Sequence, residues 1–134
     1  SGERNVFTGA RRLLEAGCRS LVVKRGEHGA LLFADGAVTP FPSFPVEAVV
    51  DPTGAGDTFA GGALGYLDLA RDFSAPRLRE AMAVGTVIAS FCVEGFGPRS
   101  FDRVSQARFA ERLKAYFAML RHDEAAVLET IKIG

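Results

Sequence analysis

The sequence predicts an α/β fold in one domain that covers residues 1–134. Short apolar runs of the kind that form strands are interspersed with longer segments in which apolar residues recur at helical spacing. The chain is also 48% hydrophobic. A chain of this length and composition can bury about two thirds of the surface that it exposes when unfolded, so we expect a substantial core.

The N-terminal elements are expected to be a helix and two strands. Residues 5–16 carry a helical apolar stripe, and Gly17 suits the C-cap. Residues 20–25 and 29–33 are apolar runs separated by a glycine-containing turn, which predicts a hairpin. The first run does not alternate with polar residues, so we expect it to be covered on both faces in a mostly parallel sheet. The second run is expected at the edge of that sheet.

Prolines and a turn signal organise the next segment. Asp35 and Gly36 predict a turn, after which residues 37–41 form a short strand. Three prolines then interrupt regular pairing. Residues 46–50 are apolar and lead into the glycine-rich segment, so they are expected to form the central strand.

Three helices are expected in the second half of the chain. Residues 58–70 predict a helix whose glycines at 61, 62 and 65 let neighbouring backbone approach. Residues 78–93 are the most uniformly apolar segment and predict a buried helix. Residues 105–120 predict a helix with Ser105 as N-cap and an apolar stripe formed by Phe109, Leu113, Tyr116, Phe117 and Leu120. Residues 121–134 suit a short extra helix, a partner-binding tail or a frayed end.

The glycine-rich segment 51–62 is the principal candidate site. Amides in the first turn of a helix lack intrahelical partners and lie at the positive end of the helix dipole. Gly54, Ala55 and Gly56 have almost no side chain, so an anion can approach these amides closely. Asp57 places a carboxylate beside them. Phosphoryl transfer to a hydroxyl needs both features: donors for developing charge and an acceptor for the proton.

A purely structural interpretation of the same segment is also open. Thr53 would then be the helix N-cap, and Asp57 an acid favoured by the dipole in the first turn. The glycines would provide a turn and close helix packing.

Three longer stretches resemble the ribokinase-like sugar and nucleoside kinases of the PfkB family. They read VDPTGAGDTFAGGALGYL, LVVKRGEHGALLF and AMAVGTVIASFCVEGFG. The resemblance implies a ribokinase-like three-layer α/β/α fold with a mostly parallel sheet, of which this chain is the C-terminal portion only. It further implies that Asp57 is the catalytic base and that the amides of residues 54–57 form the anion hole.

Further site residues follow from the resemblance. Lys24, Gly26, Gly29 and Thr53 are expected on the nucleotide side, where Lys24 offers a point charge to a phosphate. Asp51 matches a position near a monovalent-cation site, such as one for K⁺, and an ordinary turn role suits it equally. The family's Asn-x-x-Glu motif, which helps to organise magnesium, has no counterpart in this chain.

The resemblance therefore implies an ATP-dependent and Mg²⁺-dependent kinase that phosphorylates a hydroxyl of a sugar or related alcohol. Two alternatives stay open: a nucleoside kinase of the adenosine type, and a truncated nucleotide-binding module without turnover.

Composition excludes other partner classes. Sixteen basic and sixteen acidic residues give a formal net charge of zero, which provides no electrostatic footprint for nucleic acid or an anionic membrane. The longest uncharged stretch, 81–93, is shorter than the ~20 residues of a transmembrane helix. Cys18 and Cys92 form no C-x-x-C pattern. We expect a cytoplasmic protein with reduced thiols, and a homodimer is compatible with the sequence.

Overall fold

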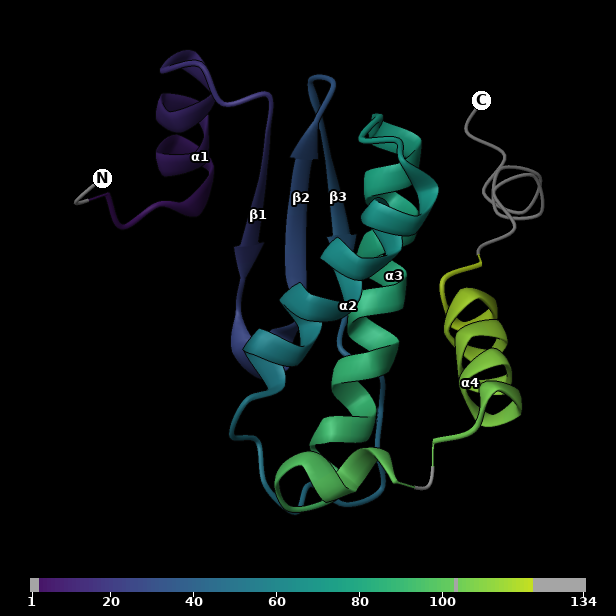
Figure 1. Ribbon diagram of the computed structural model, residues 1–134. Helices are drawn as coiled ribbons and strands as arrows, with labels where there is room; N and C mark the ends of the chain where they lie inside the picture. The colour runs from purple at the N-terminus through teal and green to yellow at the C-terminus, as the bar shows by residue number, and fades with distance from the viewer. Residues whose placement is uncertain (1–2, 103, 122–134) are drawn as a thin grey trace, which may run out of the picture.

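The computed structural model of the protein describes residues 3–102 and 104–121. In chain order its elements are α1 (Val6–Glu15), β1 (Ser20–Lys24), the 3₁₀ turn η1 (Gly26–His28), β2 (Ala30–Ala34), β3 (Ala37–Phe41), α2 (Ala55–Ala70), α3 (Ala75–Cys92), the 3₁₀ turn η2 (Gly97–Phe101) and α4 (Gln106–Met119). Figure 1 shows α1 on one side of the sheet and α2, α3 and α4 on the other. The described residues thus form three layers, α/β/α.

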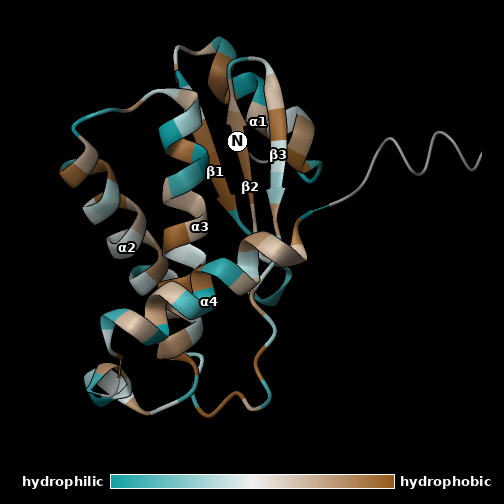
Figure 2. Ribbon diagram, turned by 90° about the vertical axis from the view of Figure 1, so that its right-hand side faces the viewer, coloured by the Kyte–Doolittle hydropathy of each residue, from teal (hydrophilic) through white to brown (hydrophobic). Residues whose placement is uncertain are grey.

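Strand β2 holds the layers together because its side chains alternate between the two faces of the sheet. Leu31 and Phe33 pack against Ala10 of α1. Leu32 lies on the opposite face, in the cluster that contains Val87 of α3. All five residues of β2 are buried. Figure 2 shows the hydrophobic strands β1 and β2 between the helices.

The three strands are antiparallel, in the order β1-β2-β3. Leu32 pairs with Val22 on one side and Thr39 on the other. The predicted turn joins β2 to β3: Asp35 and Gly36 have φ values of 50° and 73°, as a two-residue hairpin turn of the left-handed kind requires. The predicted hairpin, turn and third strand are therefore confirmed.

The position of β2 and the environment of β1 differ from the sequence predictions. Because β3 pairs with its second side, β2 is central and not at the edge. Val22 of β1 is 39% exposed, so the described residues do not cover β1 on both faces. Within the described residues every strand pair is antiparallel, and the parallel pairing that we expected is not seen.

Residues 46–50 do not form the predicted central strand. No strand lies beside them among the described residues, and Val49 and Val50 are 60% and 44% exposed. The amide of Val50 instead donates to the carbonyl of Val93 at 2.7 Å. An apolar run becomes a strand only where a neighbouring strand takes up its backbone hydrogen bonds, and here a helix end does so.

Helices α2 and α3 pack closely through glycines. A Cβ added at Gly62 would lie 2.9 Å from Cδ1 of Ile88, and one added at Gly85 would lie 2.6 Å from the carbonyl oxygen of Phe59. Gly61 and Gly65 have no atom within 4 Å of such a Cβ. The predicted close approach is therefore confirmed at Gly62 and wrong at the other two positions.

Helix α4 covers the end of the core. Ser105 is its N-cap, as predicted, and accepts the Arg108 amide at 3.2 Å. Tyr116 is fully buried and donates its hydroxyl to the carbonyl of Pro42 at 2.9 Å. Phe117, predicted in the same stripe, is 44% exposed. None of the described helices is long and apolar enough to span a lipid bilayer.

Candidate functional site

The predicted anion-binding turn lies at the N-terminus of α2. Asp51 begins it with an Asx turn, in which its Oδ1 accepts the amide of Thr53 at 2.9 Å. Gly54 is the helix N-cap and has φ 81°, a left-handed conformation that glycine adopts without strain. Thr53 is therefore not the N-cap, contrary to the structural interpretation. Because of this turn α2 begins at Ala55, one turn before the predicted start at Thr58.

Three of the four amides predicted to form the anion hole are free of partners among the described residues. The Ala55 amide donates to the Pro52 carbonyl at 3.2 Å, whereas those of Gly54, Gly56 and Asp57 make no hydrogen bond there. Asp57 lies in the first turn of α2 and is exposed. The positive end of the helix dipole thus presents free donors and a carboxylate on the same turn.

Lys24, at the end of β1, reaches this turn from a distant part of the chain. Its Nζ donates to the carbonyl oxygen of Gly56 at 3.2 Å, across 32 positions of sequence. A Cβ at Gly56 would lie 3.2 Å from the same Nζ. The structure therefore brings together two predicted site residues, and the missing side chain at Gly56 leaves room for the lysine.

The η1 loop continues directly from Lys24. Gly26 has φ 59°, and its amide has no partner among the described residues. The amide of Gly29 donates to the Gly26 carbonyl at 3.1 Å. A Cβ at Gly29 would lie 2.1 Å from the carbonyl oxygen of Phe41. Gly29 is thus required by packing against β3, and it shapes the loop that presents the free amide of Gly26.

The C-terminal end of α3 anchors the turn. The carbonyl of Val93, the C-cap residue, accepts the amides of Val50 at 2.7 Å and Asp51 at 3.3 Å. The buried thiol of Cys92 donates to the carbonyl of Thr53 at 3.7 Å. Sequence reasoning did not find these residues, because a backbone carbonyl and a lone cysteine carry no sequence signature of such contacts.

The electrostatics of the turn favour an ionised carboxylate at its start. Hydrogen bonds from the Thr53 side chain and then from the Thr53 amide lower the pKa of Asp51. Its oxygens could serve as ligands for a monovalent cation. The described residues contain no group of three His, Cys, Asp or Glu that could hold a metal ion.

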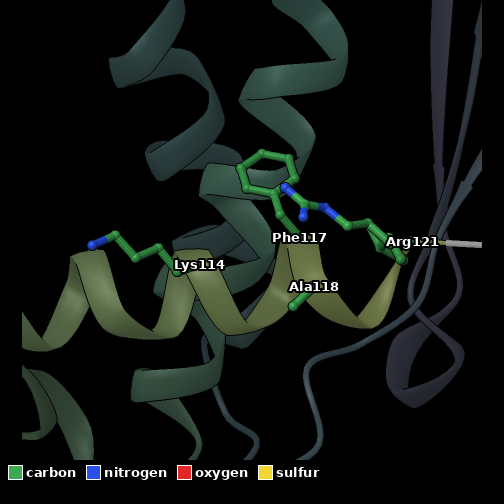
Figure 3. Close-up of a pocket in the computed structure, with 5 residues that line it drawn as sticks. Lys114, Phe117, Ala118 and Arg121 are labelled. Carbon is green, nitrogen blue, oxygen red and sulfur yellow. The ribbon is translucent and has the colours of Figure 1, made fainter.

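Two surface hollows lie away from the turn. One, of about 570 Å³, is on α4 and its C-terminal end (Figure 3), lined by Lys114, Phe117, Ala118, Leu120 and Arg121. The other, of about 520 Å³, lies beside η1 and β3 and is lined by Arg25, His28, Ala30, Leu31, Thr39, Pro40, Phe41, Pro42 and Leu120. Neither includes a residue of 51–57, so neither encloses the turn.

Known proteins of similar sequence are kinases. The cytidine kinase of Thermococcus kodakarensis is 46% identical over 69 residues, which cover 49% of this chain and 24% of the kinase. The mouse ribokinase is 36% identical over 90 residues, 66% of this chain and 27% of the ribokinase. The chain therefore spans about a quarter of the length of these relatives.

Solved kinase structures share the fold. The aminoimidazole riboside kinase of Salmonella enterica, complexed with aminoimidazole riboside and an ATP analog, superposes with a TM-score of 0.70 at 29% identity, covering 84% of this chain and 37% of that one. The ribokinase of Thermotoga maritima gives a TM-score of 0.63 at 32% identity, covering 85% and 35%. The ribokinase-like α/β fold predicted from the sequence is confirmed.

The sequence pattern of the pfkB family carbohydrate kinases matches residues 6–104, from the start of α1 to the segment that precedes α4. That match contains the turn, Lys24 and the end of α3 described above. The chain belongs to the pfkB family of carbohydrate kinases.

Proposed function

We propose that the protein is an ATP-dependent phosphotransferase that transfers the γ-phosphoryl group to a hydroxyl of a sugar or related alcohol. One observation carries the proposal: the α2 N-terminus presents the free amides of Gly54, Gly56 and Asp57 with the Asp57 carboxylate, while Lys24 Nζ lies 3.2 Å from the Gly56 carbonyl. Donors, a cation and a proton acceptor are the groups that phosphoryl transfer uses.

In this proposal Asp57 accepts the proton of the acceptor hydroxyl. The hydroxyl oxygen forms a bond to the γ-phosphorus, the bond from that phosphorus to the bridging oxygen breaks, and ADP leaves with the electron pair. The free amides of residues 54–57 stabilise the charge on the transferring oxygens. Mg²⁺ would neutralise phosphate charge when bound; the described residues contain no group of three His, Cys, Asp or Glu that could hold it.

The nucleotide side of the proposed site is formed by the β1 end and the turn. Lys24 pairs with a phosphate, the free amide of Gly26 donates to another oxygen, and Gly29 maintains the loop. Thr53 borders the same phosphates, and Asp51 is proposed as a ligand of a monovalent cation. Support for ATP comes from the riboside kinase of similar fold that was solved with an ATP analog.

Two further functions are supported by specific observations. A nucleoside acceptor is favoured by the similarity to the cytidine kinase. A nucleotide-binding module without turnover is favoured by the small share of its relatives' length that the chain covers and by the exposure of Gly54, Gly56 and Asp57. We propose a cytoplasmic location and small-molecule substrates for each of these functions.

Replacing Asp57 with asparagine tests the proposed function. In the full-length protein, Asp57→Asn should lower kcat by roughly 10²–10⁴-fold, because the amide cannot accept the proton, while ATP still binds. Asp68→Asn is the matched control, since Asp68 is an exposed carboxylate further along the same helix. A turnover close to that of the unchanged protein in Asp57→Asn would rule out its role as base.

A further inference from the structure

Arg112 of α4 lies outside the residues matched by the family pattern, yet it is one of the most engaged side chains of the described chain. Its side chain is only 14% exposed. Nη1 donates to Ser90 Oγ at 3.0 Å, and Nη2 donates to Glu94 Oε1, also at 3.0 Å. The guanidinium carbon lies 3.8 Å from the centre of the Phe91 ring. These three partners belong to the last turn of α3 or follow it directly, and the centre of the Phe44 ring lies 5.2 Å from the same guanidinium carbon.

Two residues that lie between these partners in the sequence hold the glycine-rich turn. Ser90, Phe91 and Glu94 contact Arg112, and between them lie Cys92 and Val93, which hydrogen-bond to the segment 50–53. The amide of Glu94 also donates to the carbonyl of Phe91 at 3.3 Å. A continuous series of contacts therefore runs from α4 through the end of α3 to the start of α2.

The chemistry of arginine suits this position. The planar guanidinium can bond a carboxylate and a hydroxyl while it stacks on an aromatic ring, whereas an ammonium cannot make these contacts together. A cation near the C-terminus of α3 is also favoured by the helix dipole, at the end where backbone carbonyls lack intrahelical donors. One of those carbonyls, that of Val93, is the acceptor for the turn.

We propose that Arg112 is a positioning residue: it fixes the last turn of α3 and thereby the placement of the turn 50–57 and of its free amides. The consequence for catalysis rests on the proposed function, because the turn is the proposed anion hole. The consequence for the structure of the turn does not rest on it.

Amide hydrogen exchange in the 134-residue chain tests the structural part. In Arg112→Gln the amides of Val50 and Asp51 should exchange at least about tenfold faster, since their acceptor at Val93 is no longer held. The amides of β2 should keep their rates. Lys114→Gln removes a charge from the exposed side of the same helix and serves as the control. Unchanged exchange at Val50 and Asp51 in folded Arg112→Gln overturns the proposal.

Arg112→Lys keeps the experiment decisive if the glutamine variant does not fold. Because lysine retains the charge without the fork or the stacking, it should also accelerate exchange at Val50 and Asp51. Exchange at the rate of the unchanged chain in Arg112→Lys would mean that charge alone suffices and would overturn the proposal.

Kinetics of the full-length protein test the catalytic part. Arg112→Lys should lower kcat about tenfold and leave the KM of the acceptor within about twofold, because the acceptor does not touch α4 in this proposal. If Arg112→Lys changes only the KM of the acceptor and not kcat, the catalytic part of the proposal is overturned. If exchange accelerates as expected and no phosphoryl transfer is found even in the unchanged protein, the proposed function fails while the positioning of the turn stands.

Discussion

At the scale of single residues, the site depends on where glycine is required and for what reason. Gly54 needs its left-handed φ of 81°, and nothing lies within 4 Å of an added Cβ. Gly56 has an ordinary helical position, but an added Cβ would face Lys24 Nζ at 3.2 Å. Conformation explains the first glycine, and space for a cation explains the second.

Gly54→Ala should destabilise the chain by about 1–2 kcal/mol, because an L-residue in the left-handed region brings its Cβ too close to the following carbonyl. Urea unfolding of the 134-residue chain measures this. Gly61→Ala is a control of opposite sign, since Gly61 lies inside α2 with open space around it and alanine favours a helix by about 1 kcal/mol. Equal stabilities of the two variants would contradict the assigned conformation.

Gly56→Val should weaken ATP binding by at least about tenfold, because the branched side chain occupies the space between the free amides and Lys24. Isothermal titration calorimetry with ATP gives the affinity, and the melting temperature reports whether the fold is kept. Gly61→Val places the same side chain on the same helix without a neighbour. Unchanged ATP affinity in folded Gly56→Val would indicate a packing turn only.

Residue types could be predicted from the sequence, but their distant contacts could not. Asp57, Gly54 and Gly56 were recognised as a candidate anion site, and the structure places them in one helical turn. The contact between Lys24 and Gly56 spans 32 positions, and no local pattern encodes it. Arg112 resembled any other charge on an amphipathic helix.

At the scale of elements, packing partners decided what the apolar patterns became. The run 46–50 predicted a strand, yet its last amide bonds to the end of α3. The run 29–33 predicted an edge strand, but the strand that forms there, β2, is central because the hairpin turn at Asp35 and Gly36 brings β3 to its second side. Helix patterns with clear caps, such as the one that starts after Ser105, were predicted to within one residue.

Tyr116 links α4 to the segment after β3, and its ionisation makes the stability of the fold fall at alkaline pH. Burial raises the pKa of its hydroxyl to about 12. The folded-state pKa is above the unfolded value of about 10. The contribution of the neutral Tyr116 hydroxyl to the free energy of unfolding is therefore fully present below about pH 10, and it is lost as pH rises through about pH 12. The loss should be about 2–3 kcal/mol.

Tyr116→Phe removes this dependence and should cost about 1 kcal/mol at neutral pH, where the hydrogen bond to Pro42 is lost. Urea unfolding of both chains from about pH 8 to about pH 12 measures the difference between them. The advantage of the unchanged chain should shrink and then reverse with rising pH. If the difference in unfolding free energy between the two chains stays constant across this pH range, the Tyr116 hydroxyl is not buried in its un-ionised form.

At the scale of the whole molecule, the glycine-rich turn lies on an exposed part of the described chain. The turn lies outside both hollows, and large apolar side chains stay exposed on α2 and beyond it, with Leu69 at 86% and Phe73 at 66%. The chain also spans about a quarter of its relatives. Under the proposed alternative of a module without turnover, the chain binds a nucleotide and does not complete the reaction.

Calorimetry of the 134-residue chain with ATP and Mg²⁺ should therefore detect binding that weakens with added salt, as expected for an exposed cation beside a phosphate. No phosphorylated sugar or nucleoside should appear in the same mixture. Lys24→Gln should reduce the binding, whereas Lys114→Gln should not. Turnover by this chain alone, or the absence of any heat of binding, would contradict this alternative.

The alternation of β2 has a consequence for insertions and deletions. Leu31 and Phe33 face α1, while Leu32 faces α3. A shift of the β2 register by one residue would turn Leu31 and Phe33 towards α3 and Leu32 towards α1. Each of the two hydrophobic clusters would then receive side chains of the wrong size. The two-residue turn at Asp35 and Gly36 fixes that register. A one-residue insertion there would thus disturb both layers, and with them the α3 end that carries the turn, although it lies in an exposed loop.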